Sequence, residues 1–519
     1  MRTIAGPAGH VVVVGAGLAG LSAALHLAGR GRAVTVVERE DVPGGRAGRL
    51  DAGGYRVDTG PTVLTMPAVI EETLAAVGES LAGRLDLVRL DPAYRALFAD
   101  GSAIDVHTDA GAMSDAVTQF AGPGEADGYR RLRAWLTELY EAEFGRFIAA
   151  NVDSPLALAG PSLARLAALG GFRRLEPAIG RFLTDERLRR VFTFQSLYAG
   201  QAPHQALALY AVIAYMDTVA GVYFPRGGMR ALPDALAGAA RDAGVGFRYG
   251  SPVTALERAG DRVTAVITAA GERIGCDAIV LATELRCAYE LLGRAPRRPV
   301  RLRAAPSAVV VHAGAPRQWP DAAHHTIAFG QAWRGTFRDI ITDGRPMGDP
   351  SLLVTRPTAT DPGLAPAGRD LLYILAPAPN LSAGPIDWDA AGGGYAAELI
   401  DAVAGRVLPG LASTAEIVRV VTPADWARQG LVAGTPFSYA HTAAQTGPFR
   451  PANLPRGTAN AVLAGCGTVP GVGVPIALIS GRLAADRVTG PAAPGGRAPR
   501  RRPAPGAAPR AGAPLEGAQ

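Results

Sequence analysis

Three glycines and one acidic residue near the start of the chain have the spacing of a dinucleotide-binding turn. Gly15, Gly17 and Gly20 form the pattern G-x-G-x-x-G, and Glu38 follows further along the chain. In such a turn the first glycine allows the tight bend, the second lets the backbone approach a pyrophosphate, and the third lets a helix pack closely on a strand. The carboxylate of Glu38 can accept hydrogen bonds from a ribose diol and would repel a ribose 2′-phosphate, which disfavours NADP. These residues therefore predict binding of a dinucleotide with an unphosphorylated ribose.

The segments around these residues supply the elements that would position them. Val11 to Val14 form an apolar β-branched run, which is typical of a strand buried on both faces of a parallel sheet. The glycine turn then opens a helix, whose unpaired N–H groups and positive dipole end can face phosphate oxygens. A second apolar run, Val34 to Val37, ends at Glu38. Strand, turn, helix and strand in this order predict a Rossmann-type α/β domain.

A second glycine-rich stretch follows at Gly44, Gly45 and Arg46. Two glycines permit close backbone approach, and an arginine can pair with phosphate oxygens through two hydrogen bonds. Taken alone, Gly-Gly-Arg is equally consistent with an ordinary surface turn. Directly after a dinucleotide-binding unit, it favours a second contact with the pyrophosphate of FAD.

A third glycine-rich stretch lies near the end of the folded chain, in AVLAGCGTVPGVGVPIALISGRLAAD. A strand leads into turns that contain Gly467, and a helix is expected from about Ile476 to Asp486. The N–H groups of Gly473 and Val474 would then lie near the flavin ring, where the helix dipole favours its anionic reduced form. Glycine-rich turns before a helix also occur as simple connections.

The charge distribution argues against nucleic-acid binding. The chain carries a formal net charge of +6, but five arginines against one glutamate give +4 to the tail from Pro491 alone. The folded part therefore lacks the basic surface that nucleic acid requires. The tail consists mainly of Pro, Ala, Gly and Arg, which predicts disorder. Three cysteines without metal-ligand spacing and the absence of a recognisable leader suit a reducing cytoplasm.

Two apolar stretches in the middle of the chain indicate contact with lipid or a buried helical core. Ala206 to Met216 is about half the length of a membrane span and is ended by Asp217, and Pro155 to Leu169 is interrupted by Pro161 and Arg165. Arginines flank both stretches. Such a pattern is consistent with an interfacial protein, although the residues taken alone favour a solvated basic face over a helical core.

Several longer segments together resemble the bacterial phytoene desaturases, within the wider group of flavoprotein amine oxidases and carotenoid desaturases. They are FLTDERLRRVFTFQSLYAG (182–200), GVYFPRGGMRALPDAL (221–236), AHHTIAFG (323–330), LAPAPNL (375–381) and GCGTVPGVGVP (465–475). The resemblance implies FAD-dependent desaturation of phytoene toward lycopene, with a hydride passing to the flavin and a proton lost, repeated along a hydrophobic C40 polyene. It also implies that Val253 contacts the adenine through its backbone. It favours a cytoplasmic enzyme bound to the inner face of the cell membrane, with oxygen or a quinone as electron acceptor.

The resemblance and the patterns together predict a discontinuous FAD-binding domain with an inserted substrate domain of mixed sheet and membrane-associating helices. The expected boundaries are 1–85, 223–299 and 457–490 for the FAD-binding domain, 86–222 for the helical region, 300–456 for the substrate sheet and helices, and 491–519 for the disordered tail. Within the substrate domain, strand-like runs extend from Ser307 to His312 and from Leu371 to Ala376.

The sequence leaves the proton acceptor of the reaction open. His324 and His325 lie in one of the resembling motifs and are exposed-looking, although a structural role is favoured for them. Alternative functions are a sibling carotenoid desaturase or ketolase, another amine-oxidase-like flavoenzyme, and a non-enzymatic isoprenoid-binding protein of the same fold. The segment 465–475 contains no aromatic residue for an amine-binding cage, and the intact Gly-Gly-Arg loop argues against a protein that does not bind flavin.

Overall fold

The first unit of the fold is a parallel sheet that carries the predicted dinucleotide turn. The computed structural model describes residues 1–296 and 301–492, so that most of the tail predicted to be disordered lies outside the described residues. The five parallel strands of this sheet are, in order, β19 (Ala461–Leu463), β13 (Ala278–Leu281), β1 (His10–Val14), β2 (Ala33–Val37) and β9 (Gly246–Arg248). These strands come from three distant parts of the chain, which confirms a discontinuous domain.

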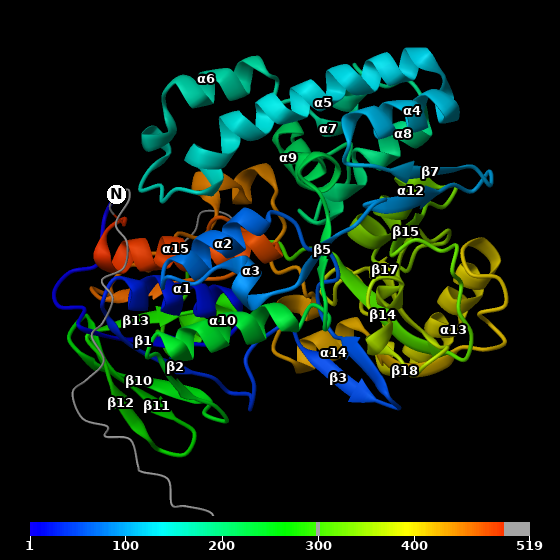
Figure 1. Ribbon diagram of the computed structural model, residues 1–519. Helices are drawn as coiled ribbons and strands as arrows, with labels where there is room; N and C mark the ends of the chain where they lie inside the picture. Colours follow the sequence, from blue (N-terminus) through cyan, green and yellow to red (C-terminus); the bar gives the residue numbers. More distant parts are fainter. Residues whose placement is uncertain (297–300, 493–519) are drawn as a thin grey trace, which may run out of the picture.

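Both faces of this sheet are covered, as the continuous apolar run of β1 predicts. Val11 and Val13 face a core shared with helices α1 (Leu18–Gly29), α10 (Ala231–Asp242) and α15 (Val474–Thr489). Val12 and Val14 face the opposite core, because side chains alternate along a strand. That second core is closed by a three-stranded antiparallel sheet and a short helix, namely β10 (Val253–Ala259), β11 (Arg262–Thr268), β12 (Arg273–Gly275) and α11 (Leu285–Leu291). In Figure 1 these layers form the lower left of the molecule.

The second unit is a seven-stranded mixed sheet on the other side of the molecule (Figure 1). Its strands are, in order, β18 (Glu416–Val421), β14 (Ser307–Ala315), β17 (Asp370–Ala378), β16 (Leu352–Thr355), β15 (His325–Ala328), β6 (Tyr94–Leu97) and β7 (Ala103–Val106). The two long strands β14 and β17 are buried almost throughout. Helices α12 (Trp333–Arg338), α13 (Trp388–Arg406) and α14 (Pro423–Arg428) accompany this sheet. The strands predicted at 307–312 and 371–376 are therefore confirmed, each a few residues longer.

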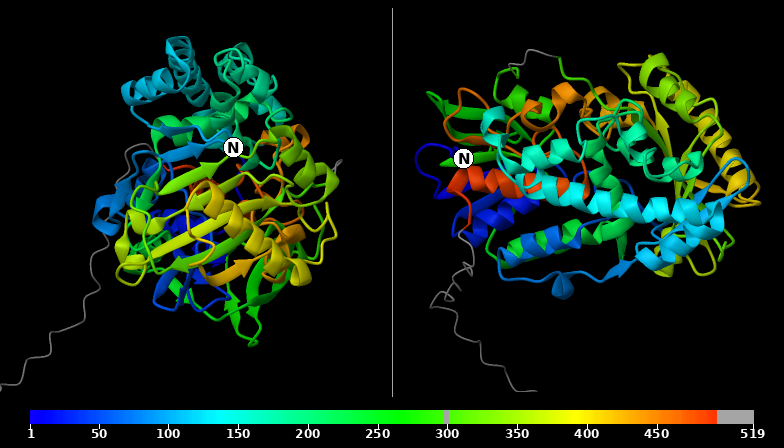
Figure 2. Two further views of the ribbon diagram at one scale, coloured as in Figure 1. Left: turned by 90° about the vertical axis from the view of Figure 1, so that its right-hand side faces the viewer. Right: turned by 90° about the horizontal axis from the view of Figure 1, so that it is seen from above.

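A layer of helices covers the top of both units in Figure 1. It consists of α4 (Ala110–Ala121), α5 (Pro123–Glu143), α6 (Pro161–Ala168), α7 (Leu175–Ile179), α8 (Glu186–Val191) and α9 (Ala211–Tyr215). Seen from above in Figure 2, α5 runs lengthwise across the molecule. Two π-helical turns, Phe144–Ile148 and Met216–Ala220, directly follow α5 and α9. We call the segment 110–220, which contains these helices and turns and the chain that links them, the helical cap.

The segment 86–222, predicted to be helical, begins with strands and not with a helix. Strand β5 (Leu87–Arg89) pairs with β8 (Tyr223–Pro225), and β6 and β7 extend the seven-stranded sheet before the first cap helix begins. Strands this short carry little periodic signal. In addition, Arg95 and Asp105 pair with each other across β6 and β7. These two charged residues obscure the alternation of apolar and polar residues that would indicate strands.

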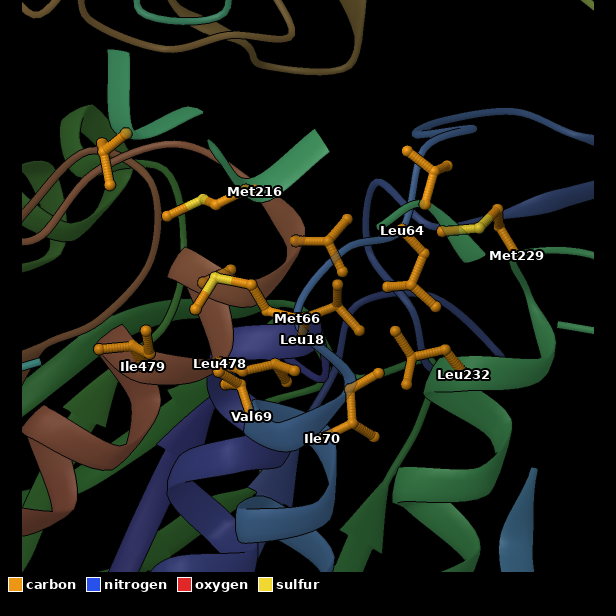
Figure 3. Close-up of a cluster of buried hydrophobic side chains, with 14 of the residues drawn as sticks. Leu18, Leu64, Met66, Val69, Ile70, Met216, Met229, Leu232, Leu478 and Ile479 are labelled. Carbon is orange, nitrogen blue, oxygen red and sulfur yellow. The ribbon is translucent and has the colours of Figure 1, made fainter. Parts of the chain in front are cut away.

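The remaining elements lie between β2 and β5 along the chain. They are β3 (Arg49–Ala52), β4 (Tyr55–Asp58), α2 (Pro67–Ala75) and α3 (Leu81–Arg84). Figure 3 shows the buried cluster where these parts meet: Met216 of the cap lies above Leu18, Met66 and Leu478, which come from α1, the start of α2, and α15. The cap therefore shares one hydrophobic core with the nucleotide-binding unit.

Candidate functional site

The first glycine turn has the geometry that its sequence predicts. Gly15 has φ +103°, and a Cβ there would lie 2.8 Å from the carbonyl oxygen of Ala282. At Gly20 a Cβ would overlap the carbonyl oxygen of Gly15, so this glycine is required by the packing of helix on turn. Gly17 differs from both: its φ is −70°, and the nearest atom to a Cβ there would be the Gly45 Cα at 4.0 Å. The fold therefore leaves the space beside Gly17 open.

The Gly-Gly-Arg loop lies directly against this turn. Gly44 donates its N–H to the carbonyl oxygen of Ala16 at 2.9 Å, and Gly17 and Gly44 form a parallel β-bridge. Arg46 pairs with the carboxylate of Glu284, the residue that precedes α11. The Arg46 Nε is buried beside the cavity described below and has no hydrogen-bond partner among the described residues. An orphaned cationic donor between two glycine loops fits a pyrophosphate group.

Glu38 lies at the carboxyl end of β2, where the sequence places it. Its side chain is buried and accepts hydrogen bonds from the backbone N–H groups of Ala16, at 2.5 Å, and of Glu40, at 3.0 Å. The carboxylate is thus fixed at the edge of the glycine turn. This position suits recognition of a ribose diol and disfavours a 2′-phosphate by charge repulsion.

The C-terminal glycine stretch leads into α15 as predicted, although the helix begins earlier and ends later than expected. Gly473 precedes its first turn with φ +131°, a conformation that favours glycine. Ser480 fixes the loop by accepting from the N–H of Gly465 and donating to the carbonyl oxygen of Val469. Gly467 packs on α11, where a Cβ would lie 2.6 Å from the Cβ of Leu285.

These three loops line one end of a single large cavity of about 1590 Å³. The predicted cofactor residues found in its lining are Gly15, Gly17, Glu38, Gly44, Gly45, Arg46, Val253, Gly473 and Val474. Gly20 and Gly467 lie outside the lining and support the turns behind it. The residues thus provide a cradle of glycines, two helix N-termini, an orphaned arginine N–H and a ribose-binding carboxylate, and this set fits FAD.

Beyond the glycine loops the same cavity continues as an apolar chamber between the helical cap and the seven-stranded sheet. Its walls from the cap include Ile148, Leu166, Phe194, Leu209 and Ile213. Its walls from the sheet and its helices include Ile327, Phe329, Trp333, Leu375 and Trp426. The chamber and the cofactor end are continuous, so a long hydrophobic molecule can reach the cofactor without leaving the apolar environment.

Polar groups interrupt this apolar lining, among them Glu143, Asp217, Tyr210 and His441. Burial raises the pKa of the Glu143 carboxyl well above its usual range and raises the pKa of Asp217 to about 8. Burial, with a smaller contribution from Arg450, lowers the pKa of His441 well below its usual range, which keeps its imidazole neutral. None of these groups was predicted from the sequence to be a site residue. The only signal in the sequence was Asp217, a charge that ends an apolar run.

The histidine pair at 324 and 325 is buried, contrary to its exposed look in the sequence. Their Nδ1 atoms bond to Thr360 and Thr355 at 2.7 and 2.9 Å, and neither histidine belongs to the cavity lining. This placement supports the structural role that was favoured for them.

The rim of the chamber is formed by the cap segment from Pro155 to Phe172. Pro155, Leu158 and Leu163 line the cavity, while the side chain of Leu156 is 85% exposed and that of Phe172 is 51% exposed. Exposed arginines adjoin this rim at positions 146, 165, 173 and 174. Among the described residues, no helix combines the length and hydropathy of a membrane span.

Known proteins resemble this chain both in sequence and in fold. Residues 18–489 match the model of the family described as flavin containing amine oxidoreductase. The chain is 64% identical to a phytoene dehydrogenase of Streptomyces griseus, covering 97% of this chain and 99% of that one. It is 33% identical to a lycopene-forming phytoene desaturase of Pseudescherichia vulneris, covering 92% and 98%. Among solved structures, cyclohexylamine oxidase from Brevibacterium oxydans has the same fold, with a TM-score of 0.58 at 18% identity over 92% of this chain and 98% of that one.

Proposed function

This chain belongs to the flavin containing amine oxidoreductase family, together with bacterial phytoene desaturases, and from that membership we propose that it desaturates phytoene toward lycopene. It is an FAD-dependent oxidoreductase. The observation that carries the proposed substrate is the continuity of the glycine-loop cradle with a large apolar chamber. A hydrophobic polyene needs such a chamber, whereas a small polar substrate would leave it unfilled.

We propose specific contacts for the cofactor. Arg46 and the N–H groups at the start of α1 would hold the pyrophosphate, and Glu38 would bind the adenosine ribose. Val253, at the first residue of β10 and in the cavity lining, would contact the adenine through its backbone. Gly473 and Val474 would present the N-terminus of α15 to the flavin ring, where its dipole stabilises negative charge.

The chemistry follows from this arrangement. Bound FAD supplies a two-electron acceptor for hydride, while the protein supplies binding and alignment. The apolar walls hold a CH2–CH2 unit flanked by double bonds near the cofactor end of the cavity and keep water away from it. An allylic position stabilises the positive charge that develops as hydride leaves. Repetition along the polyene requires only that the substrate slide in the chamber or re-enter it.

The predicted domain boundaries separate the segments that would bind the cofactor from those that would enclose the substrate. Segments 1–85, 223–299 and 457–490 would bind FAD, and 86–222 with 300–456 would enclose the substrate. Support comes from the strands and helices of the first three segments, which build the parallel sheet and its flanking layers. The remaining segments contribute the cap and the seven-stranded sheet.

The test of the substrate is direct. FAD-loaded protein incubated with phytoene in phosphatidylcholine vesicles should yield carotenoids with more conjugated double bonds, separated by chromatography. Unchanged phytoene, with conversion of a more conjugated carotenoid offered in parallel, would assign the chain to a sibling desaturase.

We further propose that the rim of the chamber docks on the inner face of the cell membrane, from which the substrate is drawn and where a quinone or oxygen accepts the electrons. Exposed Leu156 and Phe172 beside the chamber, with arginines around them, have the composition of an interfacial surface. Leu156→Asp should weaken co-sedimentation with vesicles that contain anionic lipid. Ile417→Asp, which alters a side chain 51% exposed on β18, serves as the matched control and should leave binding unchanged.

A further inference from the structure

Arg450 is a buried arginine in the lining of the cavity. It is 2% exposed and directly follows the short helical turn Gly447–Phe449. Arginine is rarely fully buried, because removing its charge from water costs much free energy. A buried guanidinium in the wall of a largely apolar cavity therefore calls for a role for its positive charge.

The hydrogen bonds of Arg450 hold it against the glycine stretch that leads into α15. Its Nε donates to the carbonyl oxygen of Thr468 at 3.0 Å, and its Nη2 donates to that of Cys466 at 2.6 Å. The Nη1 and Nη2 atoms also donate to the carbonyl oxygen of Tyr439, each at 3.3 Å. The same stretch continues through Gly473 to the first turn of α15. The guanidinium is thus fixed beside the loop that would present this helix to the flavin ring.

These bonds leave the charge of Arg450 able to act on the cavity, because carbonyl oxygens hold a guanidinium without cancelling its charge. After burial, the charge of Arg450 is the second cause of the low pKa of His441, which also lines the cavity. The ring of His441 lies against Gly471 of the same loop, where a Cβ would overlap this ring. The positive charge therefore reaches the part of the cavity beside α15.

The two carboxyl groups of the apolar chamber do not offset this charge at neutral pH. Burial raises the pKa of Glu143 well above its usual range and that of Asp217 to about 8, so both are mainly protonated at pH 7. A charge acts more strongly through a protein interior than through water. The charge of Arg450 and the positive end of α15 therefore act in the same direction in this part of the cavity.

We propose that Arg450 raises the reduction potential of bound FAD by stabilising the negative charge that the flavin ring gains with each hydride, an inference that rests on the proposed placement of the ring at α15. The C–H bond of the substrate breaks with both of its electrons. A neutral ring that takes up the hydride becomes an anion, and the substrate carbon becomes an allylic cation. A nearby positive charge lowers the free energy of that anion and leaves the neutral ring little changed. An allylic C–H group lacks the nitrogen lone pair that assists hydride loss from an amine, so oxidation of a polyene benefits from such a charge.

The test measures the reduction potential of FAD-loaded protein against a reference dye under anaerobic conditions, without phytoene. Loss of one charge near the ring should change this equilibrium about tenfold or more, so Arg450→Gln should lower the potential by about 30 mV or more. Arg450→Lys retains the charge and should keep most of the potential. Thr468→Val is the matched control, because it removes the 2.7 Å hydrogen bond from the Thr468 hydroxyl to the Pro451 carbonyl oxygen and no charge. It should lower the unfolding temperature and leave the potential unchanged.

An Arg450→Gln protein with the potential of the unaltered protein would overturn the proposal. Equal losses of potential in Arg450→Gln and in either Arg450→Lys or Thr468→Val would also overturn it, because they would show that the hydrogen bonds matter and not the charge. If Arg450→Gln does not retain FAD, the absorbance spectrum of the photoreduced unaltered protein decides. Its reduced flavin should remain anionic at a pH at which free reduced FAD is largely neutral, and a neutral spectrum would refute the proposal. Phytoene left unconverted by protein with the expected potentials would instead refute the proposed function.

Discussion

Replacing Gly17 by alanine should separate folding of the chain from binding of FAD. The backbone at Gly17 has φ −70°, which any residue adopts, and the new methyl carbon would meet no atom closer than the Gly45 Cα at 4.0 Å. The methyl group would instead occupy the space between the two glycine loops, where a pyrophosphate must approach the backbone. The substitution is therefore compatible with the protein alone and incompatible with the bound cofactor.

The substitution should change the stability of the protein without FAD much less than it changes the stabilisation that FAD provides. A glycine-to-alanine change at a compatible position stabilises a protein by about 0.4–1 kcal/mol, and alanine is less favourable than glycine before a helix, so the two terms largely offset each other. FAD at 100 times its Kd stabilises the unaltered protein by about 2.7 kcal/mol. If the methyl group weakens FAD binding about 100-fold, the same FAD concentration stabilises the variant by only about 0.4 kcal/mol.

Thermal unfolding with and without FAD measures both quantities. Gly17→Ala should unfold at nearly the same temperature as the unaltered protein without FAD, and should lose the increase that FAD produces. Gly20→Ala is the matched control, because its Cβ would overlap the Gly15 carbonyl oxygen and should lower stability in the absence of FAD as well. A Gly17→Ala protein that retains FAD with unaltered affinity would refute the assigned cradle.

Three further outcomes follow from the contacts of the site and the core. Arg46→Ala should weaken FAD binding about tenfold or more, and should lower stability without FAD because the mostly buried carboxylate of Glu284 loses its cation. Adding Glu284→Ala should restore stability and not FAD affinity, as urea unfolding and FAD titration would show. Gly481→Ala should cost about 1–3 kcal/mol of unfolding free energy, because its Cβ would overlap the backbone of α1, whereas Gly405→Ala, with open space around it, should not destabilise. Asp217→Asn should stabilise the protein progressively more as the pH rises from 4 to 8, because the unfolded chain ionises Asp217 in its ordinary range whereas burial raises its pKa in the folded protein to about 8, so the unaltered protein loses stability over that range. A difference in unfolding free energy between the two proteins that is the same at pH 5 and pH 8 would contradict this.

The parts of the fold that the sequence predicted are those whose signal is local. The opening strand, the glycine turn and the strand ending at Glu38 follow one another within a single βαβ unit, so their pattern is complete in one stretch of chain. The buried strands β14 and β17 were evident as apolar runs for the same reason. Strands β6 and β7 were missed because they are only four residues long and carry the paired charges of Arg95 and Asp105.

The parts of the site that were missed depend on tertiary contacts. Nothing in the local sequence indicates that Glu284 pairs with Arg46 or that Glu143 lies inside an apolar chamber. Glu143 ends a helix rich in charged residues, and only the packing of the cap distinguishes it from exposed Glu141. Asp217 was interpreted as the end of an apolar stretch, although the same interruption marks a polar group inside the cavity.

The central claim is that a bound flavin oxidises a polyene held in the adjoining chamber. The measurement that tests it most directly is the absorbance of FAD-loaded protein mixed anaerobically with phytoene in vesicles, with products analysed from the same sample. The account predicts that the oxidised flavin band bleaches while a carotenoid with additional conjugated double bonds appears in equal amount. A flavin that stays oxidised in the presence of bound phytoene would contradict it.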